Sequence, residues 1–252
     1  MKTFISWSGG KDSTASIILA YEHGVHIDGV VFSEVMFDQS RNISGENPTQ
    51  IKWIYETAIP IIEKQFGFKV YVLRDKSDYI KEFNHIVTRS KIPERNGKKT
   101  GWLLGGMCVA NDRLKMRPLK KFFKQVGEHE QIVGIAYDET QRIERLKKYD
   151  NKWSILDKYG ITEEMTFDIC KKYNLLSPIY KMRSRGGCWF CPNASIKELA
   201  SVKKQYPELW HELEILSHDK DVISNGFKYG KPFWEVDKEI DMINSQMTIF
   251  DI

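Results

Sequence analysis

The stretch FISWSGGKDSTAS, residues 4–16, decides the predicted fold. It combines a short apolar strand, a turn with two adjacent glycines and residues that favour the start of a helix. Gly9 and Gly10 let the backbone come close to a ligand, and the free amides and dipole at the start of a helix attract an anion. These features predict a phosphate-binding cradle. The alternative is an ordinary serine-rich turn between a strand and a helix.

This cradle is not a Walker loop. A Walker loop requires a glycine five residues before Gly10, where this chain has Ile5. It also requires serine or threonine after the lysine, whereas Asp12 follows Lys11. The string SGGKDS instead resembles the PP-loop of the adenine nucleotide α-hydrolase superfamily. That superfamily contains ATP pyrophosphatases, enzymes that activate sulfur for tRNA and DNA, and phosphoadenylylsulfate (PAPS) reductases.

The resemblance continues in the expected order from residue 4 to about residue 210. Cys108 precedes Leu-Lys-x-x-Pro-Leu at residues 114–119, and the fourth predicted strand leads into a glycine, an acidic pair and an arginine. The string GGCWFCP follows at residues 186–192. This combination is similar to the PAPS reductase-like proteins carried by phages and mobile elements.

Apolar segments alternate with amphipathic segments in the first 150 residues. They predict strands at residues 4–7, 27–32, 69–73 and 131–135, and helices at residues 14–22, 48–65, 79–87 and after Cys108. Strands joined by helical crossovers run parallel, and ligands gather at their carboxyl ends, where SGGKDS lies. The sequence therefore predicts an α/β fold with a three-layer, Rossmann-like parallel sheet, which the resemblance extends to a PP-loop fold.

The predicted domain organisation places a nucleotide-binding domain at residues 1–150 and a helical C-terminal region at residues 151–252. The C-terminal region carries the C-x-x-C site and is expected to pack on the first domain. The basic, glycine-rich segment 88–107 is too short to separate domains, so we interpret it as a mobile loop over the site.

The resemblance implies a set of nucleotide-binding residues. They are Ser6, Ser8, Gly9, Gly10, Lys11, Asp12 and Ser13 in and before the loop, Val31, Phe32 and Ser33 beside the adenine, and Gly134 after the fourth strand. It also implies catalytic roles for Lys11 and Asp12, and for Lys115 and Arg142, which would neutralise developing charge. Without the resemblance, the basic helix that follows Cys108 would be read as a solvated face.

Four cysteines in a chain expected to be cytoplasmic are poor disulfide candidates. Cys188 and Cys191 can bind one metal through a tight turn, and Cys108 can join them if the basic helix begins beside it. Cys170 is either a fourth ligand or a core residue. The spacing leaves both Zn²⁺ and a [4Fe–4S] cluster open, and the resemblance favours the cluster.

The leading functional prediction is an enzyme that binds ATP with Mg²⁺, cleaves at the α-phosphate and activates an acceptor in sulfur transfer or nucleic-acid modification. One alternative is reduction of PAPS or adenylylsulfate (APS). Reductases of this kind attack the sulfate through a cysteine in a C-terminal Glu-Cys-Gly motif, and no cysteine follows Cys191 here, so a partner would supply the thiol. Another is an accessory protein that binds nucleotide or nucleic acid without turnover. The expected partners are an adenine nucleotide and either a nucleic acid or a sulfur-carrier or thiol protein.

The composition is that of a globular protein. The 252 residues are 41% hydrophobic and 29% charged, with a formal net charge of +4 that permits an anionic partner without requiring one. No apolar run approaches the roughly 20 residues that span a bilayer, and the first residues lack a secretory apolar region. We therefore expect a cytoplasmic protein without a membrane partner. The oligomeric state stays open, with a homodimer as one option.

Overall fold

The computed structural model describes the backbone of residues 1–105 and 107–250 and the side chains of residues 1–103 and 108–245. The chain divides into two compact units. The sheet unit comprises Met1–Glu34, Glu46–Arg74 and Met116–Gly186, and the cysteine unit comprises Val35–Gly45, Asp75–Lys115 and the chain from Gly187 onward. The predicted boundary at residue 150 does not match this division, because the chain passes repeatedly between the two units.

The sheet unit is built on five parallel strands in the order β10-β9-β1-β2-β5. The strands are β1 (Lys2–Trp7), β2 (Gly29–Glu34), β5 (Val70–Arg74), β9 (His129–Val133) and β10 (Lys152–Trp153). The central strand β1 pairs with β2 on one side and β9 on the other. The strand order reverses at β1, and the carboxyl ends of strands at such a point form the usual ligand crevice of an open α/β sheet.

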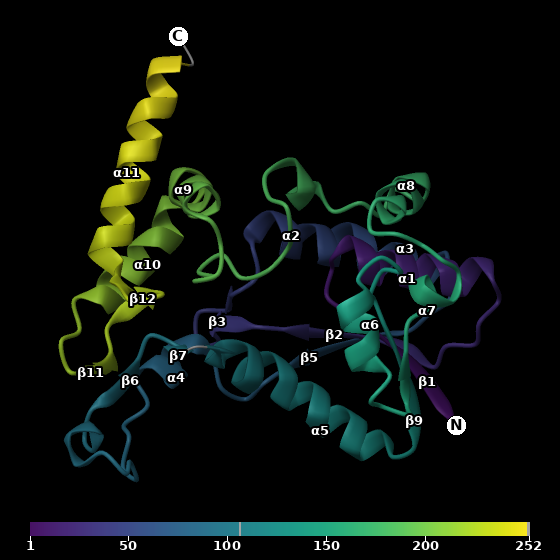
Figure 1. Cartoon of the computed structure of the whole chain (residues 1–252), viewed down its shortest axis with the longest axis horizontal. Coiled ribbons are helices and arrows are strands. Elements are labelled where there is room, and N and C mark those ends of the chain that lie inside the picture. The colour runs from purple at the N-terminus through teal and green to yellow at the C-terminus, as the bar shows by residue number, and fades with distance from the viewer. Residues whose placement is uncertain (106, 251–252) are drawn as a thin grey trace. The chain divides into compact units, whose positions relative to one another are not determined.

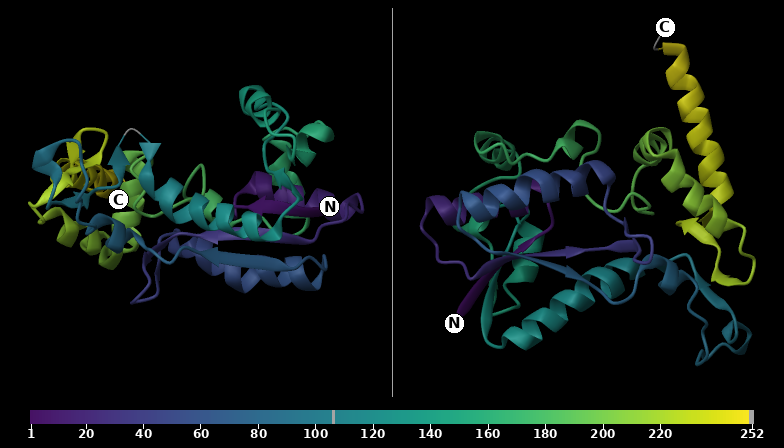
Figure 2. Two further views of the ribbon diagram at one scale, coloured as in Figure 1. Left: turned by 90° about the horizontal axis from the view of Figure 1, so that it is seen from below. Right: turned by 180° about the vertical axis from the view of Figure 1, so that it is seen from behind.

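Helices cover both faces of this sheet, as a three-layer α/β fold requires. They are α1 (Lys11–Glu22), α2 (Pro48–Trp53), the π-helix η1 (Ile54–Ala58), α3 (Ile59–Lys64), α5 (Arg117–Val126), α6 (Thr140–Leu146), α7 (Ile155–Lys158), α8 (Met165–Lys172) and the 3₁₀ turn η4 (Pro178–Lys181). Figure 1 shows α2 and α3 on one side of the strands and α5 on the other, and the view from behind in Figure 2 agrees.

The alternation of side chains along β1 builds two separate cores. Ile5 and Trp7 point into the larger core, which includes buried residues of α1, α7 and α8, while Phe4 packs with Val31 and Phe123 under α5. Each fully buried aliphatic or aromatic side chain stabilises the fold by about 1.5–3 kcal/mol. The strand-loop-helix prediction for residues 4–22 is confirmed, because α1 begins directly after Gly10.

The predicted helix at residues 48–65 is confirmed in extent, but it is not uniform. Asn47 caps it by accepting a hydrogen bond from Thr49 N–H, and Pro48 occupies its first turn. In its middle, Ile59 N–H bonds to Ile54 O, five residues back. Pro60 lacks an N–H and cannot follow an ordinary helical turn without a clash, so a π-turn before it accommodates the ring.

The cysteine unit holds the remaining elements. They are β3 (Met36–Asp38), β4 (Ile43–Ser44), α4 (Tyr79–Phe83), the 3₁₀ turn η2 (Pro93–Arg95), β6 (Lys99–Gly101), β7 (Leu104–Gly105), β8 (Met107–Cys108), the π-helix η3 (Asn111–Met116, whose last residue belongs to the sheet unit), α9 (Ile196–Gln205), α10 (Pro207–Ser217), β11 (Val222–Ser224), β12 (Gly226–Lys228), β13 (Lys231–Pro232) and α11 (Phe233–Phe250).

Segment 88–107, interpreted from sequence as a mobile loop, is instead partly built into the cysteine unit. Its strand β6 pairs in parallel with β11, and Trp102 is buried against Phe83, Phe227 and Phe233 at ring-centroid distances of 5.4, 5.0 and 6.0 Å. Glycine-rich composition suggested a loop, but the aromatic anchor fixes the segment. Its residue 106 lies outside the described residues.

Candidate functional site

The SGGKDS turn lies between β1 and α1, at the carboxyl end of the central strand. Two serine hydroxyls hold it in shape: Ser8 N–H donates to Ser13 Oγ at 3.2 Å, and Gly10 N–H donates to Ser8 Oγ at 3.3 Å. Ser13 Oγ–H in turn donates to Gly10 O at 3.0 Å. The backbone amides of the turn are therefore bound by hydroxyl groups, which are weak acceptors that a phosphate oxygen can replace.

Glycine is required at position 9 for two reasons. Its φ of +74° is unfavourable for other residues, and a Cβ there would lie 2.8 Å from both Gln50 Nε2 and Ile54 Cδ1. Gln50 is buried, and its Nε2 donates to Ser8 O at 3.4 Å. A Cβ on Gly186 would collide with Gln50 Oε1. The Gln50 amide therefore packs between Gly9 and Gly186, which are far apart in sequence, and supports the turn through its bond to Ser8 O.

Gly134 allows the end of β9 to approach the start of α1. A Cβ on Gly134 would lie 2.5 Å from Ser13 N and 2.6 Å from Ser13 Cα, which are backbone atoms that cannot move aside independently. The structure therefore places Gly134 beside the cradle, where the family resemblance expects it. Glycine is needed at position 134 because the backbone there lies too close to Ser13 for a side chain to fit.

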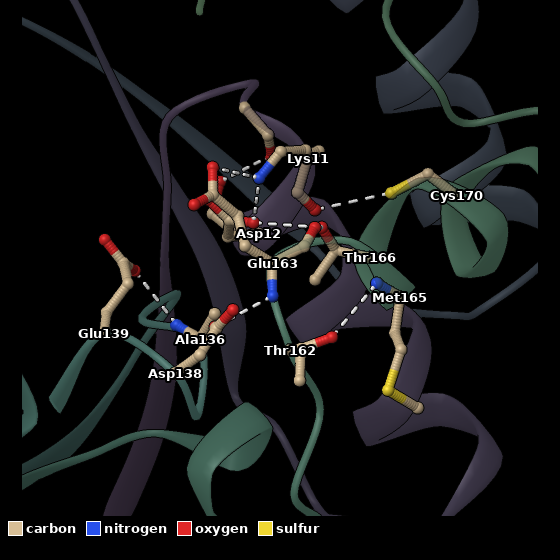
Figure 3. Close-up of polar contacts among 12 residues, drawn as sticks. Lys11, Asp12, Ala136, Asp138, Glu139, Thr162, Glu163, Met165, Thr166 and Cys170 are labelled. Atoms are coloured by element: carbon tan, nitrogen blue, oxygen red, sulfur yellow. Dashed lines mark hydrogen bonds and ion pairs between the residues drawn. The ribbon is translucent and has the colours of Figure 1, made fainter.

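Lys11 is buried, and its ammonium group bonds to two carboxylates inside the sheet unit (Figure 3). Lys11 Nζ donates to Asp12 Oδ1 at 2.7 Å and to Glu163 Oε1 at 2.8 Å. Thr166 Oγ1–H donates to the same Asp12 oxygen at 3.0 Å. Burial alone would lower the pKa of Lys11, but the hydrogen bonds to the two carboxylates raise it. In this arrangement Lys11 organises the acidic side of the cradle.

Tyr180, in η4, reaches the first turn of α1. Its hydroxyl oxygen accepts a hydrogen bond from Lys11 N–H at 2.8 Å, and it would lie 3.5 Å from a Cβ at Gly10. Burial raises the pKa of Tyr180, so the phenol keeps its proton at neutral pH. A neutral phenol oxygen is a weaker acceptor than a charged phosphate oxygen, which can replace it at this amide.

Carboxylates line the loop that follows β9. Asp138 Oδ1 accepts from Glu163 N–H at 2.9 Å, and Glu139 Oε2 accepts from Ala136 N–H at 3.1 Å (Figure 3). Arg142 on α6 forms an ion pair with Glu139 and is about half exposed. The predicted catalytic Arg142 thus belongs to the same unit as the cradle, with its guanidinium held by a carboxylate.

The residues predicted to line the adenine pocket occupy the end of β2, but their side chains are buried. Val31 and Phe32 have no exposed surface and pack into the cores on opposite faces of the sheet, and Ser33 is 1% exposed. Only the backbone of Val31 and Phe32 can meet a ligand, because alternate side chains of a central strand fill the two cores. Ser6, also predicted at the nucleotide, lines a groove along the sheet face instead of the turn.

The strand end also carries a buried ion pair that the sequence did not reveal. Glu34, 1% exposed, accepts from Arg74 Nε at 2.9 Å and from Tyr55 O–H at 2.6 Å. Burial and the hydrogen bond to Glu34 raise the pKa of Tyr55 to about 12. Because Glu34 and Arg74 end paired strands, this network fixes the edge of the crevice next to the cradle.

Three of the four cysteines belong to the cysteine unit and pack against one apolar cluster: Cys108, Cys188 and Cys191. Cys191 N–H donates to Cys188 O at 3.2 Å, so the C-x-x-C segment forms a tight turn. Burial raises the pKa of Cys108, and the neighbouring Cys191 raises it further. Burial and the nearby thiols of Cys108 and Cys188 raise the pKa of Tyr79. The three thiols therefore occupy a common neighbourhood.

The C-x-x-C turn is anchored by its aromatic residues. Trp189 N–H donates to Gly45 O at 3.0 Å, and its indole Nε1–H donates to Ser44 O at 2.9 Å. Phe190 packs against Tyr79 with a ring-centroid distance of 4.3 Å. Burial raises the pKa of Cys108, and Lys115 in η3 of the same unit is near enough to offset part of that rise. Lys115 therefore shares a unit with the cysteines, and Arg142 shares one with the cradle.

Cys170 belongs to the other unit. It lies on α8 of the sheet unit, has no exposed surface and packs among the apolar residues around α1. Its Sγ–H donates to Lys11 O at 3.3 Å, and burial raises its pKa to about 12. These surroundings suit a neutral core thiol, which was the alternative to metal ligation.

The donor chemistry of the three remaining cysteines fits an iron–sulfur cluster. Among the residues whose side chains are described, no group of three His, Cys, Asp or Glu is gathered so that it could hold one metal ion. The thiolates of a cluster bind different iron atoms and stand farther apart than the ligands of a single Zn²⁺. All-thiolate ligation suits both tetrahedral Zn²⁺ and an iron–sulfur cluster, so the three thiols leave both open.

No family model matches the chain. The uncharacterized proteins MJ0066 and MJ0973 of Methanocaldococcus jannaschii are 26% identical over 231 residues and 27% identical over 235 residues. The matches cover 83% and 88% of this chain, but only 40% and 50% of the two relatives. The solved structure of the U34-tRNA thiolase NcsA from Methanococcus maripaludis, with its [4Fe–4S] cluster, is similar with a TM-score of 0.39 and 13% identity, over 87% of this chain and 73% of that chain.

Proposed function

We propose that the chain is a PP-loop enzyme that binds ATP, cleaves it at the α-phosphate and thereby activates an acceptor for sulfur transfer or nucleic-acid modification. The observation that carries the proposal is the turn at the end of β1. Its amides are held by exchangeable hydroxyl groups at the start of α1, where the strand order of a parallel sheet reverses. Such a position suits the phosphates of a nucleotide.

The residues around the turn take defined roles in this proposal. The amides of Gly10 and Lys11 bind phosphate oxygens once these oxygens displace Ser8 Oγ and the Tyr180 hydroxyl. Transfer at a phosphate is promoted mainly by positioning and by neutralising charge, so a covalent nucleophile is unnecessary. Lys11 maintains the position of the Asp12 carboxylate through its buried ion pair.

Mg²⁺ bound with ATP would neutralise part of the phosphate charge. Mg²⁺ prefers oxygen ligands and is usually held by one or two carboxylates together with substrate phosphates. Asp12 fits this role, because Lys11 and Thr166 bond to its Oδ1 while its Oδ2 accepts no hydrogen bond from the described residues. Arg142 would contribute positive charge after releasing Glu139.

The cysteine unit would hold a [4Fe–4S] cluster through Cys108, Cys188 and Cys191. Such a cluster, when bound, supplies an iron site for handling sulfur or a rigid structural centre. In the protein itself, Trp189 and Phe190 fix the C-x-x-C turn through a hydrogen bond to Ser44 O and packing against Tyr79. Cys170 is left out of this ligand set, because it is buried in the sheet unit.

Product analysis tests the proposal. Purified protein is incubated anaerobically with ATP, Mg²⁺, a sulfide source and, in separate reactions, bulk tRNA or single-stranded DNA. Formation of AMP and pyrophosphate that depends on an acceptor supports cleavage at the α-phosphate. Formation of ADP and phosphate contradicts it. If PAPS or APS yields sulfite with added thiol while ATP gives no product, the reaction is sulfonucleotide reduction instead.

A further inference from the structure

A groove of about 630 Å³ lies in the sheet unit between α5 and the adjacent face of β9. Alternate residues of β9, namely His129, Gln131 and Val133, lie along it because they share one face of the sheet. Parallel sheets normally bury both faces under apolar helices. Strand β9 lies between β10 and β1, yet it presents a histidine and a glutamine to a groove. A polar strip at this place is unfavourable for packing alone, which suggests a ligand.

The polar strip is held in one arrangement. The ring of His129 stacks on Phe123 at a centroid distance of 4.5 Å, and its Nδ1–H donates to Gly127 O at 2.6 Å. A carbonyl can only accept, so Nδ1 carries the proton in this tautomer, and Nε2 accepts from Gln131 Nε2 at 2.8 Å. Gln131 Oε1 has no donor among the described residues. The Gln131 amide is therefore fixed with an acceptor to offer.

The groove is also positively charged. Lys120 and Lys124 lie one helical turn apart on α5, and Lys152 lies on β10. None of the described residues that line the groove is acidic. Clefts lined by charge of one sign concentrate ligands of the opposite sign, so this groove suits an anion that also offers hydrogen-bond donors to Gln131.

We propose that this groove binds nucleotide units of a single-stranded nucleic acid, with phosphates against the lysines and a base edge against Gln131. Glutamine side chains pair well with base edges, and lysines bind phosphates. Unstacked strands expose both groups at once. The groove contains no residue of the turn 8–13, so this site is additional to the phosphate cradle and goes beyond the proposed ATP reaction. A free mononucleotide offers the same chemistry.

Fluorescence anisotropy of a labelled, single-stranded RNA of roughly 12 nucleotides, titrated with the full chain without ATP, tests the proposal. The test variant is Lys124→Glu/Lys152→Glu. The matched control is Lys52→Glu/Lys64→Glu, which makes the same charge change on α2 and α3. We expect the test variant to lose at least about tenfold in affinity and the control less than about twofold. The slope of log affinity against log salt should fall by about 1.4 for two lysines.

A second variant separates base contact from charge. Gln131→Leu should alter the preference among homopolymeric RNAs while leaving the salt slope within about 0.3 of the wild-type value. AMP is titrated in parallel by calorimetry. If the wild type binds AMP but not RNA, and the lysine variant loses AMP binding, the groove is a site for free nucleotides, which use the same lysine and glutamine contacts.

Two results overturn the proposal. One is equal RNA affinity in the wild type and the lysine variant, both shown to be folded by circular dichroism. The other is binding of an acidic peptide as tightly as the RNA, with no effect of Gln131→Leu on the peptide. An acidic peptide needs only the lysines. Gly10→Val serves as a check on independence: it should leave RNA affinity unchanged even though it disrupts the phosphate cradle.

Discussion

The hydroxyl oxygen of Tyr180 accepts a hydrogen bond from the backbone N–H of Lys11 at 2.8 Å. The bond joins the first turn of α1 to a 3₁₀ turn 169 residues later in the chain. It occupies an amide that a bound phosphate would use. The nucleotide-free state is therefore stabilised by a contact that the substrate should replace.

Tyr180→Phe should cost about 1 kcal/mol of unfolding free energy without nucleotide, because the Lys11 amide loses its partner. With saturating ATP the difference from wild type should shrink, since a phosphate oxygen takes the place of the hydroxyl. Urea unfolding with and without ATP measures both values. Tyr159→Phe, on a partly exposed tyrosine, is the control and should change neither. An equal loss in both conditions would mean that Tyr180 only supports the fold.

Gly134→Ala should destabilise the sheet unit by about 1–3 kcal/mol and weaken ATP binding, because the new methyl group meets Ser13 backbone atoms at 2.5–2.6 Å. Gly226→Ala is the matched control, since its nearest atom would be Gly230 N at 3.9 Å. Urea unfolding and calorimetric titration of ATP measure the two effects. Wild-type stability and affinity in Gly134→Ala would show that β9 and α1 are not as tightly apposed as described.

Sequence alone predicted the parts of the fold that depend on local patterns. The β1-turn-α1 segment follows from alternation, paired glycines and helix-forming residues within a short window. Strand β10 was missed because it has only two residues, Lys152 and Trp153, and carries no apolar run. The two units are built from segments that alternate along the chain. This division depends on contacts between segments distant in sequence, which the periodicity of apolar residues does not reveal.

The site was predictable to a similar degree. The turn residues and Gly134 were proposed from a recognisable string, but Tyr180, Glu163 and Gln50 were not assigned, since only the folded chain brings them to the turn. Sequence also left Cys170 open, because spacing cannot distinguish a ligand from a buried thiol.

Within the part of the chain that the structure describes, no helix is long and apolar enough to cross a membrane.

The cysteines can be separated by substitution. Cys108→Ser, Cys188→Ser and Cys191→Ser should each lose most of the iron and sulfide from anaerobically purified protein, because ligation by thiolates couples to the local fold. Cys170→Ser should retain the cluster and be only mildly destabilised. Iron and sulfide assays with visible absorption check this. Loss of iron from Cys170→Ser as complete as from Cys188→Ser, or stoichiometric zinc in place of iron, would contradict the proposed cluster site.

Asp38 should make the stability of the cysteine unit depend on pH. Burial opposes ionisation, but hydrogen bonds from Ser40 and Arg41 lower its pKa to about 2. A lowered pKa stabilises the fold above the unfolded value of about 3.9, and this contribution disappears as the pH falls through about 2. The shift corresponds to about 2 kcal/mol at neutral pH.

Asp38→Asn should therefore lose about 2 kcal/mol at pH 7 and unfold like the wild type near pH 2, as measured by urea unfolding. The control Asp168→Asn alters a carboxylate that is 81% exposed and should change stability by less than about 0.5 kcal/mol. A constant difference between Asp38→Asn and wild type from pH 7 to pH 2 would show that the carboxylate charge is not what stabilises this loop.

Calorimetric titration of Mg²⁺-ATP into wild type and Gly10→Val shows whether the SGGKDS turn is the phosphate cradle. A Cβ at position 10 would lie 3.3 Å from Ser8 Oγ and 3.5 Å from the Tyr180 hydroxyl, so valine should crowd the anion site without disturbing the core. We predict at least about tenfold weaker binding, or about 1.4 kcal/mol, in a variant with wild-type circular dichroism. Wild-type ATP affinity in folded Gly10→Val would mean that this turn does not hold the phosphates.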